Sequence, residues 1–170
     1  MQWIRDIINE WDPICLFPMA PEDEYDDEIV EIYNLLNEAD FSIEEVEESI
    51  ERIFTKSFGK DVFCSFASKC KCREVAERLH QIMHAQKWLQ KIFLKLGFVY
   101  KIVNQKKYLV FNNTYCKISF IYEEDSFVIE TADTYADAET GVFEDSDWFS
   151  IEDIKEHPEK IRNIIINYYM

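Results

Sequence analysis

The sequence predicts an α+β fold in which an N-terminal helical bundle is followed by an antiparallel β-meander flanked by helices. Three observations predict this fold. Apolar residues recur at helical spacing up to residue 96, the apolar period changes to two from Phe98 onward, and turn residues separate the short alternating runs. A chain of 170 residues, 48% of them hydrophobic, is long enough for two small domains, which we expect over residues 1–86 and 87–170.

Three helices are expected in the first part of the chain. The first spans residues 2–10, and the second spans residues 24–38, where an acidic first turn suits the helix dipole. The third follows Ser42, which forms a capping box with Glu45, and it ends where Gly59 provides a natural stop.

A proline-rich loop joins the first two helices. Residues 11–21 include three prolines, and because proline fixes φ and lacks a backbone donor, this segment is neither helix nor central strand. The loop is either a structural plug or a contact surface. We favour the plug, with Trp11 and Phe17 packed under the helical bundle and the carboxylates of residues 23–28 on its outer rim.

A brief apolar connector over residues 62–66 leads into a long helical pattern. The apolar stripe continues over residues 69–96 and Gly97 closes it, so one helix of roughly 28 residues is expected to join the two domains. The alternative is a break of this helix between residues 84 and 87.

From Phe98 onward, the alternation of apolar and polar residues predicts short strands joined by hairpins. Turn signals lie at Asn112-Asn113 and at residues 123–125, and residues 142–149 form a candidate edge strand. The four other expected strands of the meander cover residues 98–103, 108–111, 115–122 and 127–131.

Two short helices are expected after the strands. Ser150 with Asp153 forms a capping box that starts the first of them. Pro158 opens the second, because its fixed φ suits the first turn of a helix, and apolar residues at helical spacing follow it.

The net charge of −16 is unevenly distributed along the chain. Residues 1–68 carry a balance of −14, residues 69–122 a balance of +9 and residues 123–170 a balance of −11. Acidic surfaces repel nucleic acid and attract basic proteins, so we expect a basic protein partner and no nucleic acid, although the basic middle alone would suit phosphates. The alternative is that the charges provide solubility and that the basic middle pairs internally with the acidic ends.

Several features predict a cytoplasmic protein without a membrane partner. No segment reaches the roughly 18 consecutive apolar residues that a membrane span needs, and the N-terminus lacks a signal-peptide pattern. The cysteines form no repeated framework, so we expect reduced thiols. The five cysteines are Cys15, Cys64, Cys70, Cys72 and Cys116.

One helical segment has a spacing that metal sites use. Glu77, His80 and His84 fall along one side of the expected long helix. A di-iron site would need a second Glu-x-x-His pair, and a zinc protease would need glutamate where Gln81 stands. We favour the alternative, a structural helix flank on which His84 packs near Trp88.

Two other clusters invite a cofactor interpretation. Cys70 and Cys72 are closer in sequence than the cysteines of a typical structural zinc site, and they lack the Cys-x-x-Cys spacing of a redox site. The carboxylates of residues 23–28 lack the glycine turn and the distal glutamate of a calcium loop. The sequence also contains no nucleophile elbow, serine–histidine pair or phosphate loop. We therefore expect no metal, no other cofactor and no catalysis.

An unusual combination of residues marks the first half of the chain. It comprises Trp11-Asp12-Pro13, Asp23-Glu24-Tyr25 with Glu28-Ile29, the pair Ile53-Phe54 with Phe58, and the segment from Ala76 to Leu79. On these residues the chain resembles the YugE-like family of small uncharacterised bacterial proteins. The resemblance covers residues 1–86 and implies a compact helical bundle, but it implies no catalytic residue. That family typically has a small residue at the position of Cys15 and usually stops where this chain continues.

The second half carries a different pattern, rich in acidic residues. It comprises Phe127 to Asp133, Asp137-Ala138, Val142 to Asp145, and Asp147. On these residues the chain resembles the small immunity proteins of bacterial polymorphic toxin systems. The resemblance implies a cytosolic, acidic protein that binds a cognate toxin, often a basic nuclease.

We therefore expect a non-catalytic binding protein, an immunity protein that occludes its toxin with an acidic, aromatic surface. Carboxylates would pair with lysine and arginine of the toxin, and aromatic side chains would anchor the contact. The expected partner-binding residues are Asp133, Asp137, Glu139, Glu144, Asp145, Asp147 and Trp148, with Glu22, Asp23, Asp26 and Asp27 as a second acidic face. The alternatives are solvated charge runs, and a regulatory or scaffold adaptor that binds a housekeeping partner or self-associates.

Overall fold

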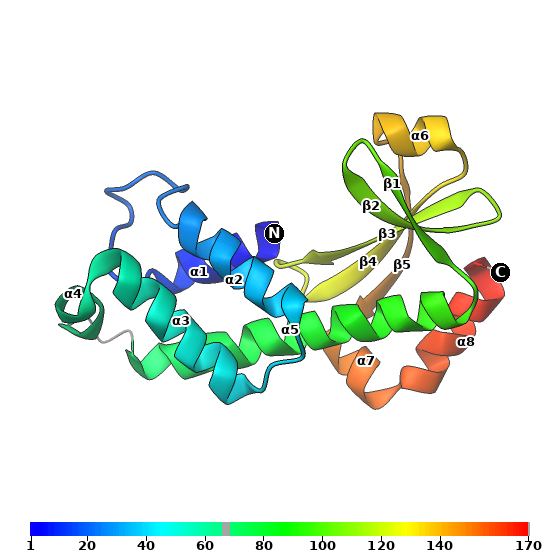
Figure 1. Cartoon of the computed structure of the whole chain (residues 1–170). Helices are drawn as coiled ribbons and strands as arrows, with labels where there is room; N and C mark the ends of the chain where they lie inside the picture. Colours follow the sequence, from blue (N-terminus) through cyan, green and yellow to red (C-terminus); the bar gives the residue numbers. More distant parts are fainter. Residues whose placement is uncertain (66–68, 170) are drawn as a thin grey trace. The chain divides into compact units, whose positions relative to one another are not determined.

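The computed structural model describes residues 1–65 and 69–169, with the backbone alone at positions 64, 65, 69, 70, 145 and 146. Its helices and its five-stranded antiparallel sheet form an α+β fold, with the N-terminal helices preceding the strands (Figure 1). The predicted fold class is therefore confirmed.

The chain divides into two compact units, Met1–Met83 and His84–Met170. The boundary between the units falls inside α5 (Lys69–Lys95), which is a single helix of 27 residues. The expected boundary after residue 86 lies in the same helix. The helix has no break between residues 84 and 87, so that alternative is wrong.

The first unit is built from helices. Ser42 caps the third of them with its side chain, since Ser42 Oγ accepts a hydrogen bond from the Glu45 N–H at 3.3 Å and the Glu45 carboxylate accepts one from the Ser42 N–H at 2.8 Å. The predicted capping box is thus confirmed. Besides the first part of α5, the helices of this unit are α1 (Gln2–Trp11), α2 (Asp26–Glu38), α3 (Ile43–Phe58) and α4 (Lys60–Ser65).

The connector expected over residues 62–66 is wrong in its described part, because α4 takes its place. The Phe63 N–H donates to the Gly59 carbonyl at 3.1 Å, so the chain continues in a helical turn directly after the glycine. Phe63 is fully buried against Trp11 and Phe54. Burial of this one ring favours the short helix, and residue 66 lies outside the described residues.

An aromatic cluster fills the interior of the first unit. Phe54 is at its centre and has no exposed surface. Phe17 of the proline-rich loop joins through Tyr25, with 5.6 Å between the ring centroids. The loop therefore packs its aromatic side chains into the helical unit, as the plug interpretation predicts. In the described part of the chain, the ring centroids 5.4–6.0 Å from that of Phe54 belong to Trp11, Tyr25, Phe58 and Phe63.

Asp12 ties the proline-rich loop to the end of α1. Its backbone is left-handed, with φ of 43°, a conformation that aspartate tolerates better than most residues. Its carboxylate accepts hydrogen bonds from the N–H of Leu16 at 2.8 Å and from that of Phe17 at 3.1 Å. It also accepts one from the hydroxyl of the fully buried Tyr25 at 2.6 Å. One side chain thus holds the helix end, the loop and the start of α2 together.

Arg73 joins α3 to the first part of α5. Its guanidinium donates to Glu44 at 2.9 Å, to Glu47 at 3.0 Å and, within its own helix, to Glu77 at 3.0 Å. A planar guanidinium has enough donors for three carboxylates at once. The hydrogen bond from Arg73 lowers the pKa of Glu44 below its usual value of 4.5.

Replacing Arg73 with methionine should lower the stability of the first unit most at neutral pH. Because the folded-state pKa of Glu44 is lowered, its contribution is fully present above pH 4.5 and is lost as the pH falls through the folded value. Urea unfolding of both proteins at several pH values should show the difference in midpoint shrinking below pH 4.5. Arg162→Met is the matched control, since Arg162 Nη1 lies 3.7 Å from a Glu159 carboxylate oxygen, farther than any of the three Arg73 contacts. A difference that is constant across pH would contradict this account.

The second unit contains an antiparallel meander in which every strand pairs with the next in the chain. Residues in the left-handed region form the tight turns, Asn104-Gln105 between the first two strands and Asn112-Asn113 between the next two. The predicted fifth strand is present as an edge. In spatial order the strands are β1 (Val99–Val103), β2 (Lys106–Phe111), β3 (Thr114–Ile121), β4 (Ser126–Ala132) and β5 (Glu144–Ser150).

One face of the sheet packs on helices through aromatic rings. Phe93 of α5 lies 4.9 Å from Phe98 and 5.6 Å from Tyr169, measured between ring centroids. Tyr169 belongs to α8 (Pro158–Tyr169), which follows α7 (Ile151–Glu156). Phe98 in turn lies 5.2 Å from Phe111 of β2. The capping box of Ser150 and Asp153 that the sequence predicts for the first of these two helices is present.

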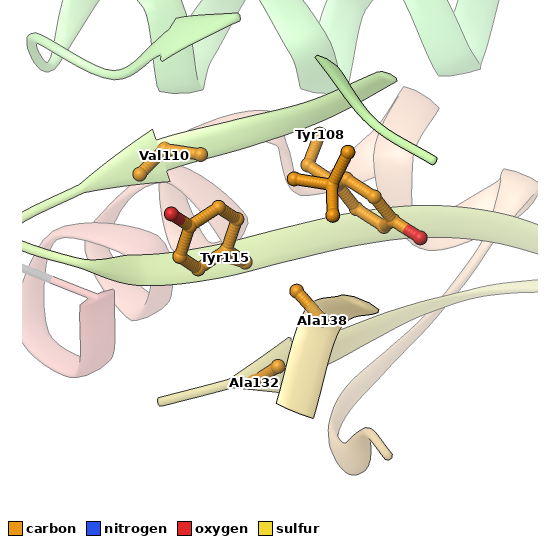
Figure 2. Packing of buried hydrophobic residues seen from close by; sticks show 6 residues of the cluster. Tyr108, Val110, Tyr115, Ala132 and Ala138 are labelled. Carbon is orange, nitrogen blue, oxygen red and sulfur yellow. The ribbon is translucent and has the colours of Figure 1, made fainter. Parts of the chain in front are cut away.

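The other face of the sheet carries a second apolar cluster (Figure 2). Strand register places Tyr108, Tyr115 and Ala132 on this face. Ala138 packs against it from α6 (Tyr135–Thr140), a helix that the sequence analysis did not predict. Six residues are too few to show a helical period, which is why the pattern missed α6. In Figure 1, α6 lies at one end of the sheet, away from α7 and α8.

Candidate functional site

A cleft of about 570 Å³ in the second unit is the candidate site. Strand ends and the last helix form it together. The lining comes from the turn between β2 and β3, the end of β4, the middle of β5 and the end of α8. Its lining residues are Phe111, Asn112, Thr114, Thr131, Asp133, Asp147, Tyr168 and Tyr169.

The cleft brings together two of the predicted binding residues. Asp133 is exposed directly after β4, while Asp147 lies within β5 opposite Ile129. Asp147 accepts a hydrogen bond from the hydroxyl of Tyr169 at 2.8 Å. This bond orients the Asp147 carboxylate. It also gives the hydroxyl of Tyr169, a side chain that is only 9% exposed, a hydrogen-bond acceptor. Tyr168, its neighbour, is 76% exposed at the rim.

The chemistry of this lining suits a cation. Carboxylates are acceptors only, and the face of a tyrosine ring attracts ammonium and guanidinium groups. Among the described lining residues there is no lysine, arginine, histidine or cysteine. A lysine or arginine side chain of a partner could therefore enter between Asp133 and Asp147 and lie along Tyr168.

The predicted residues on α6 serve the fold of the helix itself. Asp137 accepts a hydrogen bond from Thr134 Oγ1 at 2.6 Å, and its N–H donates to the same oxygen at 3.1 Å. Its carboxylate thus belongs to the cap of α6. Glu139 is exposed and accepts a hydrogen bond from the Tyr135 hydroxyl at 3.3 Å. Neither residue lines the cleft.

The predicted residues of β5 do not share one surface. Trp148 is 47% exposed and pairs with Val128, whereas the adjacent Asp147 pairs with Ile129. Because successive side chains of a strand point to opposite faces, Trp148 lies on the face opposite to the cleft. Asp147 and Trp148 therefore lie on different faces of the sheet. Glu144 is exposed at the start of the strand, and the side chain of Asp145 lies outside the described residues.

In the first unit, the second acidic face loses one of its members. Asp26 accepts hydrogen bonds from Arg5, with Nη2 at 2.5 Å from one carboxylate oxygen and 2.7 Å from the other. This bidentate pair joins α1 to α2, so Asp26 has a structural partner within the chain. The side chains of Glu22, Asp23 and Asp27 are exposed.

The histidine, cysteine and carboxylate clusters of the sequence have other partners or surroundings in part. Within residues 1–65 and 69–169, no group of three or more His, Cys, Asp or Glu side chains could hold a metal ion. Glu77 pairs with Arg73 instead. Burial raises the pKa of the Cys116 thiol to about 12, so this thiol stays protonated, while Cys15 is exposed. The side chain of Cys70 lies outside the described residues. In that same part of the chain, no helix is long and apolar enough to cross a membrane.

Sequence reasoning missed the tyrosines of the cleft. Tyr169 continues the apolar stripe of Ile161 and Ile165 at a spacing of four, a signal that would have placed it inward. No comparable signal exists for Tyr168. The sequence predicts Asn112 only as a turn residue. Its place in the cleft lining beside Thr131 and Asp133 depends on the tertiary structure.

The fold and the cleft define a two-unit α+β protein whose second unit presents carboxylates and tyrosines at one end of an antiparallel meander. Residues 3–88 match the family described as a domain of unknown function, DUF1871. The chain belongs to this family. The matched segment covers the helical unit and the beginning of the second unit. Neither a curated protein nor a solved structure matches the chain.

Proposed function

We propose that this protein is a non-catalytic protein-binding protein that neutralises a cognate toxin in the bacterial cytoplasm. A basic segment of the toxin would be held in the cleft of the second unit. The single observation that carries the proposal is the cleft itself, where Asp133 and Asp147 lie with Tyr168 and Tyr169 in a concave site of about 570 Å³. We also propose that the first half of the chain is related to the YugE-like family and the second half to immunity proteins.

Charge supports a basic partner. The segment of residues 123–170, which supplies most of the cleft, carries a balance of −11. Complementary charge accelerates association with a basic protein and makes the rate depend on salt. An aromatic side chain beside the carboxylates adds apolar contact area, and such anchors concentrate the binding energy of interfaces.

Charge reversal in the cleft tests the proposal. The probe is the small toxin domain that the proposal expects to be encoded beside the gene for this protein, and stopped-flow mixing measures association at several salt concentrations. We expect Asp133→Lys to slow association by about tenfold at low salt and to flatten its salt dependence. Asp133 is exposed, so the variant should fold.

The matched control is Glu124→Lys, which makes the same charge change at an exposed position in the turn between β3 and β4. Its association rate should stay within about twofold of the wild type, since it lies outside the cleft. Equal effects of the two variants would show that only net charge matters. Binding that neither variant changes would favour an adaptor that contacts its partner elsewhere.

A further inference from the structure

β1 forms one edge of the sheet and is unlike the opposite edge. All five of its residues pair with β2 in one unbroken register. The other edge strand, β5, has a register shift opposite Ile129 and Glu130 and carries acidic side chains, two devices that deter further strand pairing. β1 has no bulge and a single charged residue, Lys101. The edge at β1 therefore remains suitable for strand addition.

The turn after β1 determines the direction of its backbone groups. Asn104 and Gln105 form a two-residue turn with φ of 47° and 64°. In such a turn the flanking pair, here Val103 and Lys106, exchanges hydrogen bonds, and bonded and non-bonded pairs alternate from there. It follows that Lys101 directs its N–H and C=O towards β2. Tyr100 and Ile102 direct theirs away from the sheet.

The side chains along this edge are apolar and accessible. Ile102 is 75% exposed, Val99 54% and Tyr100 36%. Tyr100 and Ile102 share one face, two residues apart. The ammonium group of Lys107 lies 3.7 Å from the centroid of the Tyr100 ring, which places a positive charge on that same face. Apolar surface and positive charge thus stand together at the position where another strand would add.

The surrounding sequence makes this edge basic. Residues 84–122, which include β1, β2 and β3, contain seven lysines and no aspartate or glutamate. An added strand would therefore meet Lys101 on one face, and on the other face Tyr100 and Ile102, with the Lys107 ammonium over the Tyr100 ring. Acidic side chains complement Lys101, and like charges placed opposite each other in a sheet are destabilising.

We propose that the open edge of β1 binds an extended segment of a partner protein in which apolar residues alternate with aspartate or glutamate. The segment adds to the sheet as a sixth strand through the outward backbone groups of Tyr100 and Ile102. Its apolar side chains lie against Tyr100 and Ile102, and its carboxylates pair with Lys101. This site is separate from the cleft and takes a partner of the opposite charge.

Two other occupants are less well matched to the edge. A second copy could pair its β1 with this β1, Tyr100 opposite Ile102, but the two Lys101 side chains would then stand opposite each other. It could also offer its β5, but that strand has the register shift. Single-stranded nucleic acid would use the lysines and Tyr100, but Val99 and Ile102 would offer it nothing. Both occupants are distinguishable in solution.

The probe is a fluorescent peptide of about eight residues in which valine alternates with glutamate. We expect saturable binding measured by fluorescence anisotropy. A peptide in which lysine replaces glutamate should bind at least about tenfold more weakly, as should an acidic peptide N-methylated at alternate residues, which lacks the donors for pairing. Equal binding of either control peptide would overturn the proposal.

Variants locate the site. Ile102→Asp should weaken peptide binding by about tenfold or more, because it places a carboxylate in the apolar contact. Val142→Asp is the matched control, since Val142 is 60% exposed in the same unit, and it should change binding by less than about twofold. Circular dichroism verifies that both variants are folded. Loss of binding in both, or in neither, would contradict the assignment to β1.

Amide exchange measured by NMR gives an independent readout. The N–H groups of Tyr100 and Ile102 should exchange about tenfold more slowly with bound peptide, while that of Lys101, already bonded to β2, should change little. Protection elsewhere in the unit would overturn the proposal. So would a dimer in sedimentation that the peptide does not dissociate, or tighter binding of single-stranded DNA than of the acidic peptide.

Discussion

Replacing Phe54 with alanine should lower the free energy of unfolding of the first unit by about 3–5 kcal/mol, the range for truncating a buried aromatic side chain. Phe54 is fully buried, and among the described residues four aromatic rings surround it within 6.0 Å between centroids. Those rings belong to α1, the start of α2, α3 and α4, so a cavity here weakens every junction of the unit at once. Urea unfolding followed by circular dichroism measures the change.

Two variants bracket this expectation. Phe54→Leu keeps most of the volume and loses only the ring contacts, so it should cost about 1–2 kcal/mol. Val30→Ala, at a position of α2 that is 42% exposed, should stay within about 0.5 kcal/mol of the wild type. If Phe54→Ala cost no more than the Val30 variant, the aromatic cluster would not be the core of this unit.

Asp12→Ala should be nearly as damaging, with a loss of about 3–5 kcal/mol. The variant removes three accepted hydrogen bonds, and bonds to a charged group contribute about 1.5–3 kcal/mol each before the site relaxes. The buried hydroxyl of Tyr25 is left without its acceptor. Alanine also tolerates the left-handed backbone at this position less well than aspartate does.

Milder variants separate these contributions. Asp12→Asn keeps the left-handed backbone and one acceptor oxygen, so we expect about half of the loss. Tyr25→Phe removes the hydroxyl that donates to Asp12 and should cost about 1–2 kcal/mol. A double-mutant cycle of the two measures their coupling. If Asp12→Ala and Asp12→Asn were equally unstable, neither the backbone conformation nor the remaining acceptor oxygen would contribute.

The same hydrogen bond predicts behaviour at high pH. Burial, and then the bond to Asp12, raises the pKa of Tyr25 above its usual value near 10. Because the folded state holds this proton more tightly, the resulting stability is complete below pH 10 and is lost as the pH rises above it. Tyr25→Phe should therefore show a smaller alkaline loss of stability than the wild type, measured by urea unfolding above pH 10.

Most elements of the fold follow from local patterns. The capping boxes at Ser42 and Ser150 predict two helix starts, and the structure has both. The change of apolar period at Phe98 predicts the meander, because side chains alternate in a strand and recur on one face of a helix. The short helices α4 and α6 escape such reasoning, since their six residues give too few turns for a period.

The candidate site is less predictable than the fold. Asp133 and Asp147 are conspicuous in the sequence as part of an acidic stretch, but their separation by a helix and a turn hides the fact that they line one cleft. Asp147 and Trp148 are neighbours in sequence and lie on opposite faces of the sheet. The sequence does not distinguish Asp26 from the neighbouring carboxylates, because its pairing with Arg5 is a tertiary contact.

The sequence by itself determined the fold class and the acidic and basic segments, because periodicity, caps and charge are local properties. The continuity of α5 across the unit boundary came from the structure. Only the tertiary structure decided which carboxylates are available to a partner. Asp12, Asp26 and Asp137 bind groups of their own chain, whereas Asp133 is exposed in the cleft. That difference depends on donors brought close by packing and on strand register, which assigns adjacent residues to opposite faces.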